Sequence, residues 1–395
     1  MADGAAGQQS SPRPKLLFLV TEDWYFCSHR LPVARAARDA GFAVTVATRV
    51  TDHGEAIRRE GFALIALGMD RRNDNPLREI GSLIEILRLY RRLRPDILHH
   101  VAVKPALVGS LAAWLAGIPR VINAIAGLGY VFASRSLKAR LLRPVVTLGF
   151  RVLLDRGQNR VIVQNPDDQR LLVERGLVAP ERLTLIKGSG VDLGHFRPTP
   201  EPATGPGAPP VAALASRMIW DKGIAVLVEA ARRLKSRGVA IRVVLAGKPD
   251  PGNPAAIPES QLRAWHDEGV VEWIGFCDDV AGLWARSHIA VLPSWYGEGV
   301  PKSLLEAAAC GRPMIAADGP GLREVVRDGE TGLLIAPRDP DALADALQHL
   351  AEDGALRQRL GGAARRLAED EFGEAAVAAA TLQLYATSLK GKAGG

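Results

Sequence analysis

The chain has 395 residues, of which 47% are hydrophobic and 24% are charged. This composition excludes an intrinsically disordered protein, and the length exceeds what one ordinary core accommodates, so we expect two domains of a little under 200 residues each. The net charge of +7 favours an anionic partner, which leaves a phosphate-bearing ligand, an anionic membrane and a nucleic acid as candidates.

The chain contains no segment that predicts secretion or membrane insertion. Residues 1–13 lack the apolar stretch of a signal peptide and are predicted to be a disordered tail. No run approaches the roughly 18 apolar residues of a spanning helix. Cys27, Cys277 and Cys310 lack metal-ligand spacing, which favours buried thiols in a reducing compartment. We therefore expect a cytoplasmic protein without a bound metal.

Short apolar runs alternate with amphipathic segments in the first half of the chain, a pattern typical of parallel sheets covered by helices. The predicted strands are 16–20, 44–48, 62–67, 97–101, 121–124 and 161–164. The predicted helices include 31–40, 76–93 and 105–116. Gly41 and Gly117 follow two of these helices, where a left-handed residue is favoured. These elements predict an N-terminal Rossmann-like domain over residues 14–196.

Residues 197–210 hold six prolines and two glycines in fourteen positions, which predicts an inter-domain linker. The alternation then restarts, and the predicted strands are 211–214, 243–246, 272–276, 289–292, 314–316 and 333–335. A second Rossmann-like domain is expected over 211–370, followed by an amphipathic terminal helix over 371–390. Two doubly wound α/β domains joined by a hinge predict a ligand site in the cleft between them.

The segment 293–307 combines a strand end, a glycine-punctuated loop and a helix start near Pro301. Backbone N–H groups at a helix start form an anion site that suits a diphosphate. Glu298 in the loop and Glu306 on the helix supply carboxylates that accept hydrogen bonds from sugar hydroxyls. On spacing alone, two solvated acidic residues are an equally good interpretation.

Arg217 and Lys222 follow the first predicted strand of the second domain. The guanidinium fork and the ammonium group can converge on one diphosphate and neutralise charge on a departing nucleoside diphosphate. Considered by themselves, they are also compatible with two ordinary surface cations.

Together, Arg217, Lys222-Gly223 and Glu298-x7-Glu306 resemble glycosyltransferase family 4, a family of retaining enzymes with the GT-B fold. The resemblance extends from about residue 15 to residue 389. It implies that Arg217 and Lys222 bind the donor diphosphate, that Glu298 lies beside the transferred sugar and that Glu306 holds the ribose hydroxyls. It also implies that Gly299, Lys302 and Ser303 belong to the donor site, with backbone amides of Lys302 and Ser303 on phosphate. The terminal helix of this fold usually crosses back onto the first domain.

Further motifs resemble bacterial enzymes that extend undecaprenyl-diphosphate-linked glycans: His29-Arg30-Leu-Pro, Asn75-Pro76, Lys104-Pro105, Gly127-Leu-Gly-Tyr-Val-Phe132, Gln164-Asn165 and Gly188-Ser-Gly-Val-Asp192. This resemblance implies a UDP-hexose or UDP-N-acetylhexosamine donor, no other cofactor, and a lipid-diphosphate-linked glycan as acceptor. Arg30, Lys104 and His100 are the candidate acceptor contacts.

Many family members carry a donor-contacting His after the strand that corresponds to 121–124, where this chain has Asn123-Ala-Ile-Ala-Gly127. That contact is absent here or comes from elsewhere. His99 and His100 are candidates, although a lone His at a strand end is more often a packed core group.

Basic residues punctuate the apolar stretch 131–154, namely Arg135, Lys138, Arg140, Arg143 and Arg151, with Arg156 just beyond it. A basic amphipathic surface of this kind suits the cytoplasmic face of an anionic membrane. A helix with an ordinary solvated basic face is the competing interpretation.

Other functions lack their motifs. There is no GxGxxG after the first strand and no Walker lysine loop, which argues against dinucleotide oxidoreductases and kinases. Asp339-Pro-Asp341 is predicted to cap a helix. No aromatic residues are interleaved with the basic ones, which argues against nucleic-acid binding. Two alternatives remain beside a glycosyltransferase: a GT-B nucleotide-sugar epimerase, and a non-catalytic nucleotide-sugar-binding scaffold of a glycan-assembly complex.

Overall fold

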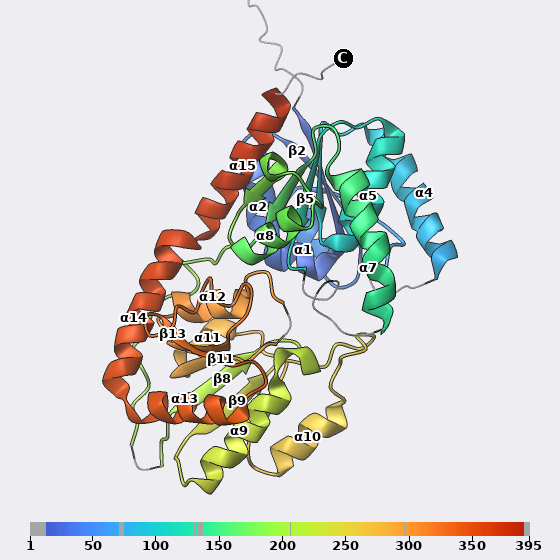
Figure 1. Ribbon diagram of the computed structural model, residues 1–395. Helices are drawn as coiled ribbons and strands as arrows, with labels where there is room; N and C mark the ends of the chain where they lie inside the picture. The colour runs from blue at the N-terminus through green and yellow to red at the C-terminus, as the bar shows by residue number, and fades with distance from the viewer. Residues whose placement is uncertain are drawn as a thin grey trace, which may run out of the picture.

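The computed structural model of the chain describes residues 13–70, 75–128, 132, 137–205, 207–295 and 297–390. Apart from Arg13, the predicted tail lies outside the described residues. The described part folds into two α/β domains, one above the other in Figure 1. None of its helices is both long and apolar enough to cross a membrane.

The N-terminal domain is built on a seven-stranded parallel sheet in the order β3-β2-β1-β4-β5-β6-β7. Its strands are β1 (Lys15–Glu22), β2 (Ala43–Arg49), β3 (Ala63–Ala66), β4 (Ile97–Val101), β5 (Val121–Ile125), β6 (Arg160–Val163) and β7 (Leu183–Leu185). The first six were predicted, and the structure confirms them with small shifts of their ends. Strand β7 was missed because three residues with a central threonine form no apolar run.

Helices cover both faces of this sheet: α1 (Asp23–His29), α2 (Leu31–Asp39), α3 (Gly54–Arg59), α4 (Pro76–Leu93), α5 (Val103–Ala116), α7 (Leu137–Gly149), the π-helical η1 (Phe150–Leu154), α8 (Pro166–Glu174) and η2 (Pro180–Arg182). Successive side chains of β1 point to opposite faces of the sheet. Phe18 packs with α1, α2 and α3, whereas Leu17 and Leu19 pack with α4 and α5. Each face of the sheet therefore has its own core.

The C-terminal domain has a six-stranded parallel sheet in the order β10-β9-β8-β11-β12-β13, the strand order of a Rossmann fold. Its strands are β8 (Val211–Ala215), β9 (Arg242–Ala246), β10 (Glu272–Gly275), β11 (Ile289–Leu292), β12 (Met314–Ala317) and β13 (Gly332–Ile335). The helices are η3 (Trp220–Lys222), α9 (Ile224–Ser236), α10 (Glu259–Asp267), α11 (Val280–Ala285), α12 (Lys302–Ala309), α13 (Pro340–Glu352) and α14 (Gly354–Glu371).

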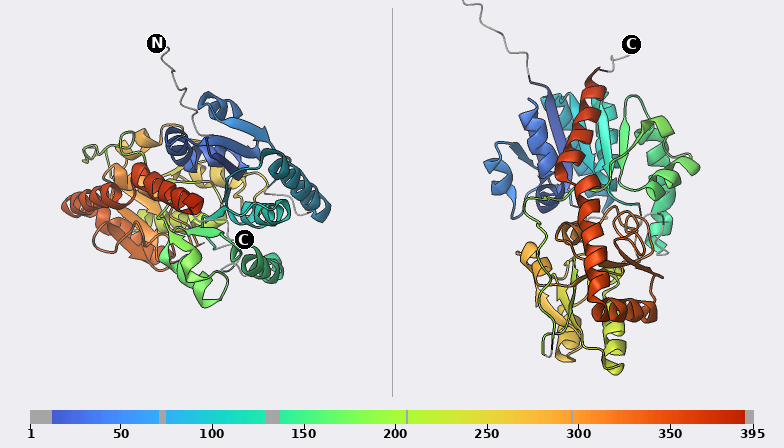
Figure 2. Two further views of the ribbon diagram at one scale, coloured as in Figure 1. Left: turned by 90° about the horizontal axis from the view of Figure 1, so that it is seen from above. Right: turned by 90° about the vertical axis from the view of Figure 1, so that its left-hand side faces the viewer.

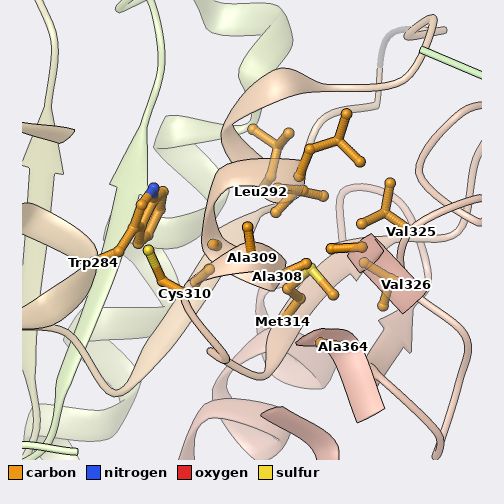
Figure 3. Packing of buried hydrophobic residues seen from close by; sticks show 14 of the residues in the cluster. Trp284, Leu292, Ala308, Ala309, Cys310, Met314, Val325, Val326 and Ala364 are labelled. Carbon is orange, nitrogen blue, oxygen red and sulfur yellow. The ribbon is translucent and has the colours of Figure 1, made fainter. Parts of the chain in front are cut away.

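Small side chains let α12 lie close to its own sheet. Ala308 and Ala309 pack among Trp284, Met314 and Ala364 in a fully buried cluster (Figure 3). Cys310 is buried at the end of this helix, whereas Cys27 and Cys277 are half-buried, so the prediction of buried thiols holds for Cys310 alone. The close packing fixes the start of α12 relative to the ends of the strands.

The last two helices connect the domains. Helix α14 ends at Glu371, and α15 (Glu374–Lys390) runs from the lower domain along the upper one (Figures 1 and 2). It packs on α2, and Tyr385 places its hydroxyl 2.6 Å from Nδ1 of His99 on β4. The sequence pattern missed the interruption at Phe372-Gly373, where Val191 N–H donates to the Phe372 carbonyl.

The segment that follows the first domain has no helix or strand in its described residues, and it is attached to the second domain by two buried arginines. Arg357 donates to Glu201, and Arg312 donates to Thr199 Oγ1. Elsewhere in the domain, Asp339 accepts from the first N–H groups of α13, so the predicted cap is confirmed.

Candidate functional site

The loops that follow β8 and β11 meet at the carboxyl edge of the second sheet, where ligands bind in such folds. Lys222 Nζ lies 2.6 Å from Glu298 Oε1, and Ser294 Oγ donates to the same oxygen at 2.8 Å. The Lys222 and Glu298 side chains are only 14% and 13% exposed. Two of the predicted site residues thus form one half-enclosed ion pair.

A glycine makes this approach possible. Gly223 has φ of +75°, and a Cβ there would lie 2.0 Å from the Pro293 carbonyl oxygen. No other residue type fits so close a contact between two backbones. The contact brings the β8 loop beside the β11 loop, and Lys222 beside Ser294 and Glu298.

Arg217 lies on the same edge but has a different partner. Its Nη1 donates to Asp250 Oδ2 at 2.6 Å, and its side chain remains 42% exposed. Asp250 is buried, so it fixes one end of the guanidinium while the other donors stay accessible. Arg217 is therefore oriented and still able to bind an anion.

The start of α12 offers backbone donors. Its N-cap, Pro301, has no side chain that could accept from the first turn. The N–H groups of Leu304 and Leu305 donate to the Pro301 carbonyl, while those of Lys302 and Ser303 have no acceptor among the described residues. Two free N–H groups at a helix start favour an anion.

Glu306 lies one turn further along α12 and is half-buried. Burial raises the pKa of its carboxyl to about 7, an effect that Lys302 opposes and Glu374 reinforces. In the described part of the chain its carboxylate has no hydrogen-bond partner. A desolvated carboxyl that has no partner among the described residues is suited to accept hydrogen bonds from ligand hydroxyl groups.

The raised pKa of Glu306 predicts a pH-dependent stability. The folded state binds the proton of the Glu306 carboxyl more tightly than the unfolded state does. The resulting contribution to the free energy of unfolding is therefore complete below pH 4.5 and is lost as the pH rises through about 7. We expect Glu306→Gln to be more stable than the wild type above pH 7, by on the order of 1–3 kcal/mol. Thermal unfolding of both proteins from pH 4.5 to 8 measures this, and the same pH dependence in both would contradict it.

Gly299 connects the site to the first domain. A Cβ on Gly299 would lie 2.0 Å from Gln164 Oε1, and one on Gly127 would lie 2.9 Å from Gly299 N. Gln164 accepts from Val300 N–H at 3.2 Å, and Asn165 Nδ2 donates to the Glu298 carbonyl at 3.3 Å. The loops after β5 and β6 thus close directly onto the Glu298 loop.

The predicted residues of the first domain lie in three different environments. His100 is fully buried, with Nδ1 at 2.9 Å from Asn123 Oδ1 and Nε2 at 2.9 Å from the Tyr90 hydroxyl. It is packed between the sheet and α4, so the structure does not bring it to the cleft. Lys104 pairs with Glu79 at 2.6 Å, while Arg30 is buried at the junction of α1 and α2.

The sequence pattern missed the part that α1 plays. Lys302 Nζ donates to the Ser28 carbonyl at 2.5 Å, and the rings of Tyr25 and His29 stack at 4.1 Å. Burial, followed by the charges of Lys302, Arg30 and Arg217, lowers the pKa of His29 to about 3. The end of α1 therefore faces Lys302 and Arg217 of the second domain. The His29-Arg30 dipeptide was the signal for it.

The chain matches two protein-family models, one for each domain. Residues 15–165 match the model described as glycosyl transferase 4-like, and residues 209–353 match glycosyl transferases group 1.

Two curated relatives are similar in sequence. N,N'-diacetylbacillosaminyl-diphospho-undecaprenol alpha-1,3-N-acetylgalactosaminyltransferase of Campylobacter jejuni is 27% identical over 372 residues, 91% of this chain and 95% of that protein. D-inositol 3-phosphate glycosyltransferase of Streptomyces bingchenggensis is 33% identical over 248 residues, 59% of this chain and 54% of that protein.

Solved structures share the fold. Anabaena Alr3699/HepE in complex with UDP and glucose superposes with a TM-score of 0.76 at 18% identity, covering 95% of this chain and all of the other. Sucrose-phosphate synthase from Thermosynechococcus elongatus gives a TM-score of 0.76 at 22% identity, covering 95% of this chain and 99% of the other. With two Rossmann-like domains that each match a glycosyltransferase model, the chain belongs to the glycosyltransferases of the GT-B fold.

Proposed function

We propose that this glycosyltransferase moves a hexose or N-acetylhexosamine from a UDP-sugar to a lipid-diphosphate-linked glycan, with retention of anomeric configuration. The observation that carries the proposal is the cluster of Lys222, Glu298 and the uncapped start of α12, closed over by the first domain. This cluster combines cations, free N–H groups and carboxylates at the carboxyl edge of the second sheet. Cations and N–H groups bind a diphosphate, and carboxylates accept hydrogen bonds from sugar hydroxyls.

Each group has a task in such a transfer. Arg217 and Lys222 neutralise the charge that develops on the departing diphosphate, and the N–H groups of Lys302 and Ser303 bind its oxygens. Glu298 accepts from the hydroxyls of the transferred sugar, and Glu306 accepts from those of the ribose. The contacts of Gln164 and Asn165 keep water away from the reacting carbon.

Retention places the acceptor hydroxyl on the face that the diphosphate leaves. The bond from the anomeric carbon to the UDP oxygen breaks, and the bond to the acceptor oxygen forms. The proton of the acceptor hydroxyl passes to a phosphate oxygen of the departing UDP. No metal ion and no covalent sugar–enzyme intermediate is required by this route.

Two relatives support the choice of substrates. Alr3699/HepE was solved in complex with UDP and glucose, which supports a UDP-sugar donor. The Campylobacter relative is named for a diphospho-undecaprenol acceptor, which supports a lipid-diphosphate-linked glycan. This is consistent with synthesis of a bacterial surface polysaccharide or lipid-linked oligosaccharide at the cytoplasmic side of the membrane.

Turnover with defined substrates tests the proposal. The enzyme is incubated in EDTA with UDP-GlcNAc, UDP-GalNAc or UDP-glucose and an undecaprenyl-diphosphate-linked sugar, and the product is examined by proton NMR. We expect an α-linked product from one of these α-linked donors. A β-linked product would contradict retention. Isomerisation of the donor with no acceptor present would favour an epimerase.

The outer face of α7 and the adjoining η1 supports a membrane partner. Leu141, Val145, Leu148 and Val152 are 44–69% exposed and recur at helical spacing, so they form one apolar stripe. Arginines line a shallow pocket beside this stripe, namely Arg140, Arg143, Arg151 and Arg175. An apolar stripe beside cationic groups suits a leaflet of anionic lipid. Arg135 lies outside the described residues, as does the side chain of Lys138, and Arg156 packs on the Trp114 ring.

Replacing two residues of this stripe is expected to weaken membrane binding. Leu141→Asp/Val145→Asp should lower the partition onto phosphatidylglycerol vesicles by about tenfold or more, because it removes apolar contacts and adds repelled charge. Co-sedimentation measures the bound fraction. Ile274→Asp/Phe276→Asp, at exposed apolar positions of the second domain, is the matched control. Equal loss of binding in both variants would contradict this surface.

A further inference from the structure

Arg30 is buried without an ion-pair partner among the described residues. Its side chain is 4% exposed, and its Nε and Nη2 atoms have neither solvent nor an acceptor. The other buried arginines of the described residues, Arg312 and Arg357, each have several acceptors, including Thr199 Oγ1 and the Glu201 carboxylate respectively. Arg30 therefore differs from the arginines that stabilise this fold.

A buried guanidinium without a counter-charge is destabilising. Burial lowers the pKa of Arg30, but an arginine in a protein stays protonated, so the charge remains. The positive charge of Arg30 lowers the free energy of unfolding, because the cost of its desolvation is not offset by an ion pair with any described residue. An anion that reached Arg30 would offset this desolvation cost.

Arg30 lies beside the residues that face the cleft. It directly follows α1, whose Ser28 carbonyl accepts from Lys302 Nζ of the second domain at 2.5 Å. The ring of Tyr25 stacks on that of His29 one turn further along α1, and both side chains interact electrostatically with Arg30 and Arg217. Arg30, Arg217 and Lys302 therefore lie around one short segment, together with the Glu298 carboxylate, and Glu306 and Glu374 lie near Lys302.

We infer that Arg30 and Lys302 form an anion site on the first-domain side of the cleft, which takes a phosphate group of a substrate diphosphate. The inference rests on the proposed function. The donor nucleotide and the lipid acceptor both carry a diphosphate, so either could supply the phosphate group, and the experiment distinguishes the two. A phosphate at this site would be held between α1 and α12, which already touch through Lys302 Nζ and the Ser28 carbonyl.

The test removes the positive charge of Arg30 and keeps the approximate volume of its side chain. Arg30→Met and Arg30→Lys are compared with the wild type for binding of UDP and of geranyl diphosphate by calorimetry, and for Tm without ligand. We expect Arg30→Met to match or exceed the wild-type Tm, because an unpaired buried charge is removed. We also expect it to bind one of the two ligands at least about tenfold more weakly, with partial rescue in Arg30→Lys. Weaker UDP binding assigns the site to the donor, and weaker geranyl diphosphate binding assigns it to the acceptor.

Arg357→Met is the matched control, since it removes a buried arginine that is paired. It should lower Tm, because Glu201 loses its partner, and leave both affinities unchanged. The inference is overturned if Arg30→Met binds both ligands as tightly as the wild type does, whatever its Tm; a Tm lowered as in Arg357→Met would then assign Arg30 a structural role. If the wild type itself binds neither ligand, the proposed function fails first, and the two failures are thereby distinguished.

Discussion

Replacing Lys222 by methionine is expected to lower the turnover number by roughly 100- to 1,000-fold, the usual cost of removing one charged donor from a developing oxyanion. Lys222 Nζ is held 2.6 Å from Glu298 in a half-enclosed cleft, where its charge is poorly screened by water. A diphosphate that enters the cleft would share this ammonium group with Glu298. The loss should therefore fall on the chemical step more than on the affinity for the acceptor.

Steady-state kinetics with saturating acceptor measures this effect. Removing Lys222 also leaves Glu298 without its cation, so Lys222→Met is expected to lose some stability. The double variant Lys222→Met/Glu298→Gln should regain that stability without regaining activity. Lys235→Met, an exposed lysine on α9, is the control and should turn over normally. Near-normal turnover in Lys222→Met would remove this residue from the diphosphate site.

Gly299→Ala is expected to lower kcat/KM by about 10- to 100-fold, as small displacements at a reacting centre do, with little change in Tm. The backbone of Gly299 does not have a positive φ, so alanine is tolerated within its own domain. Its Cβ would, however, lie 2.0 Å from Gln164 Oε1 and 3.1 Å from the Ala126 carbonyl oxygen across the cleft. Relief of this clash must displace the Gln164 amide oxygen, which accepts from Val300 N–H, and the 3.1 Å approach to the Ala126 backbone requires a further small shift between the two loops.

Kinetics together with thermal unfolding measures both parts of the expectation. Gly362→Ala in the interior of α14, where a Cβ meets only ordinary contacts, is the control; it should leave kcat/KM unchanged and raise Tm slightly, because alanine is the better helix former. Gly299→Ala/Gln164→Ala removes the side chain of the nearer clash and should recover part of the activity. Full activity in Gly299→Ala alone would show that the contact across the cleft is not needed for transfer.

The sequence predicted the two sheets well, because buried parallel strands produce uninterrupted apolar runs. The meeting of Lys222 and Glu298 at the carboxyl edge of the second sheet was also predictable, because the carboxyl ends of parallel strands lie together. Their direct ion pair was not predictable, because it depends on a close approach of the Gly223 and Pro293 backbones that leaves no room for a Cβ at position 223. The short strand β7 was missed for lack of a hydrophobic pattern.

The first-domain contributions were harder to predict, because they depend on side-chain direction. His99 and His100 are adjacent on β4 and point to opposite faces of the sheet, toward Tyr385 and Tyr90 respectively. No pattern in the sequence says which face is open. The contact of Asn165 with Glu298 joins residues 133 positions apart, so it depends on how the two domains are placed.

Calorimetric titration with UDP, GDP, UDP-GlcNAc, UDP-GalNAc and UDP-glucose in metal-free buffer, for the wild type and Glu306→Ala, tests the donor site most directly. We predict that the wild type binds UDP and one or more UDP-sugars and discriminates against GDP, and that Glu306→Ala loses this binding because the ribose hydroxyls lose their acceptor. If no nucleotide binds to the wild type, the donor site is contradicted and a non-catalytic scaffold is favoured.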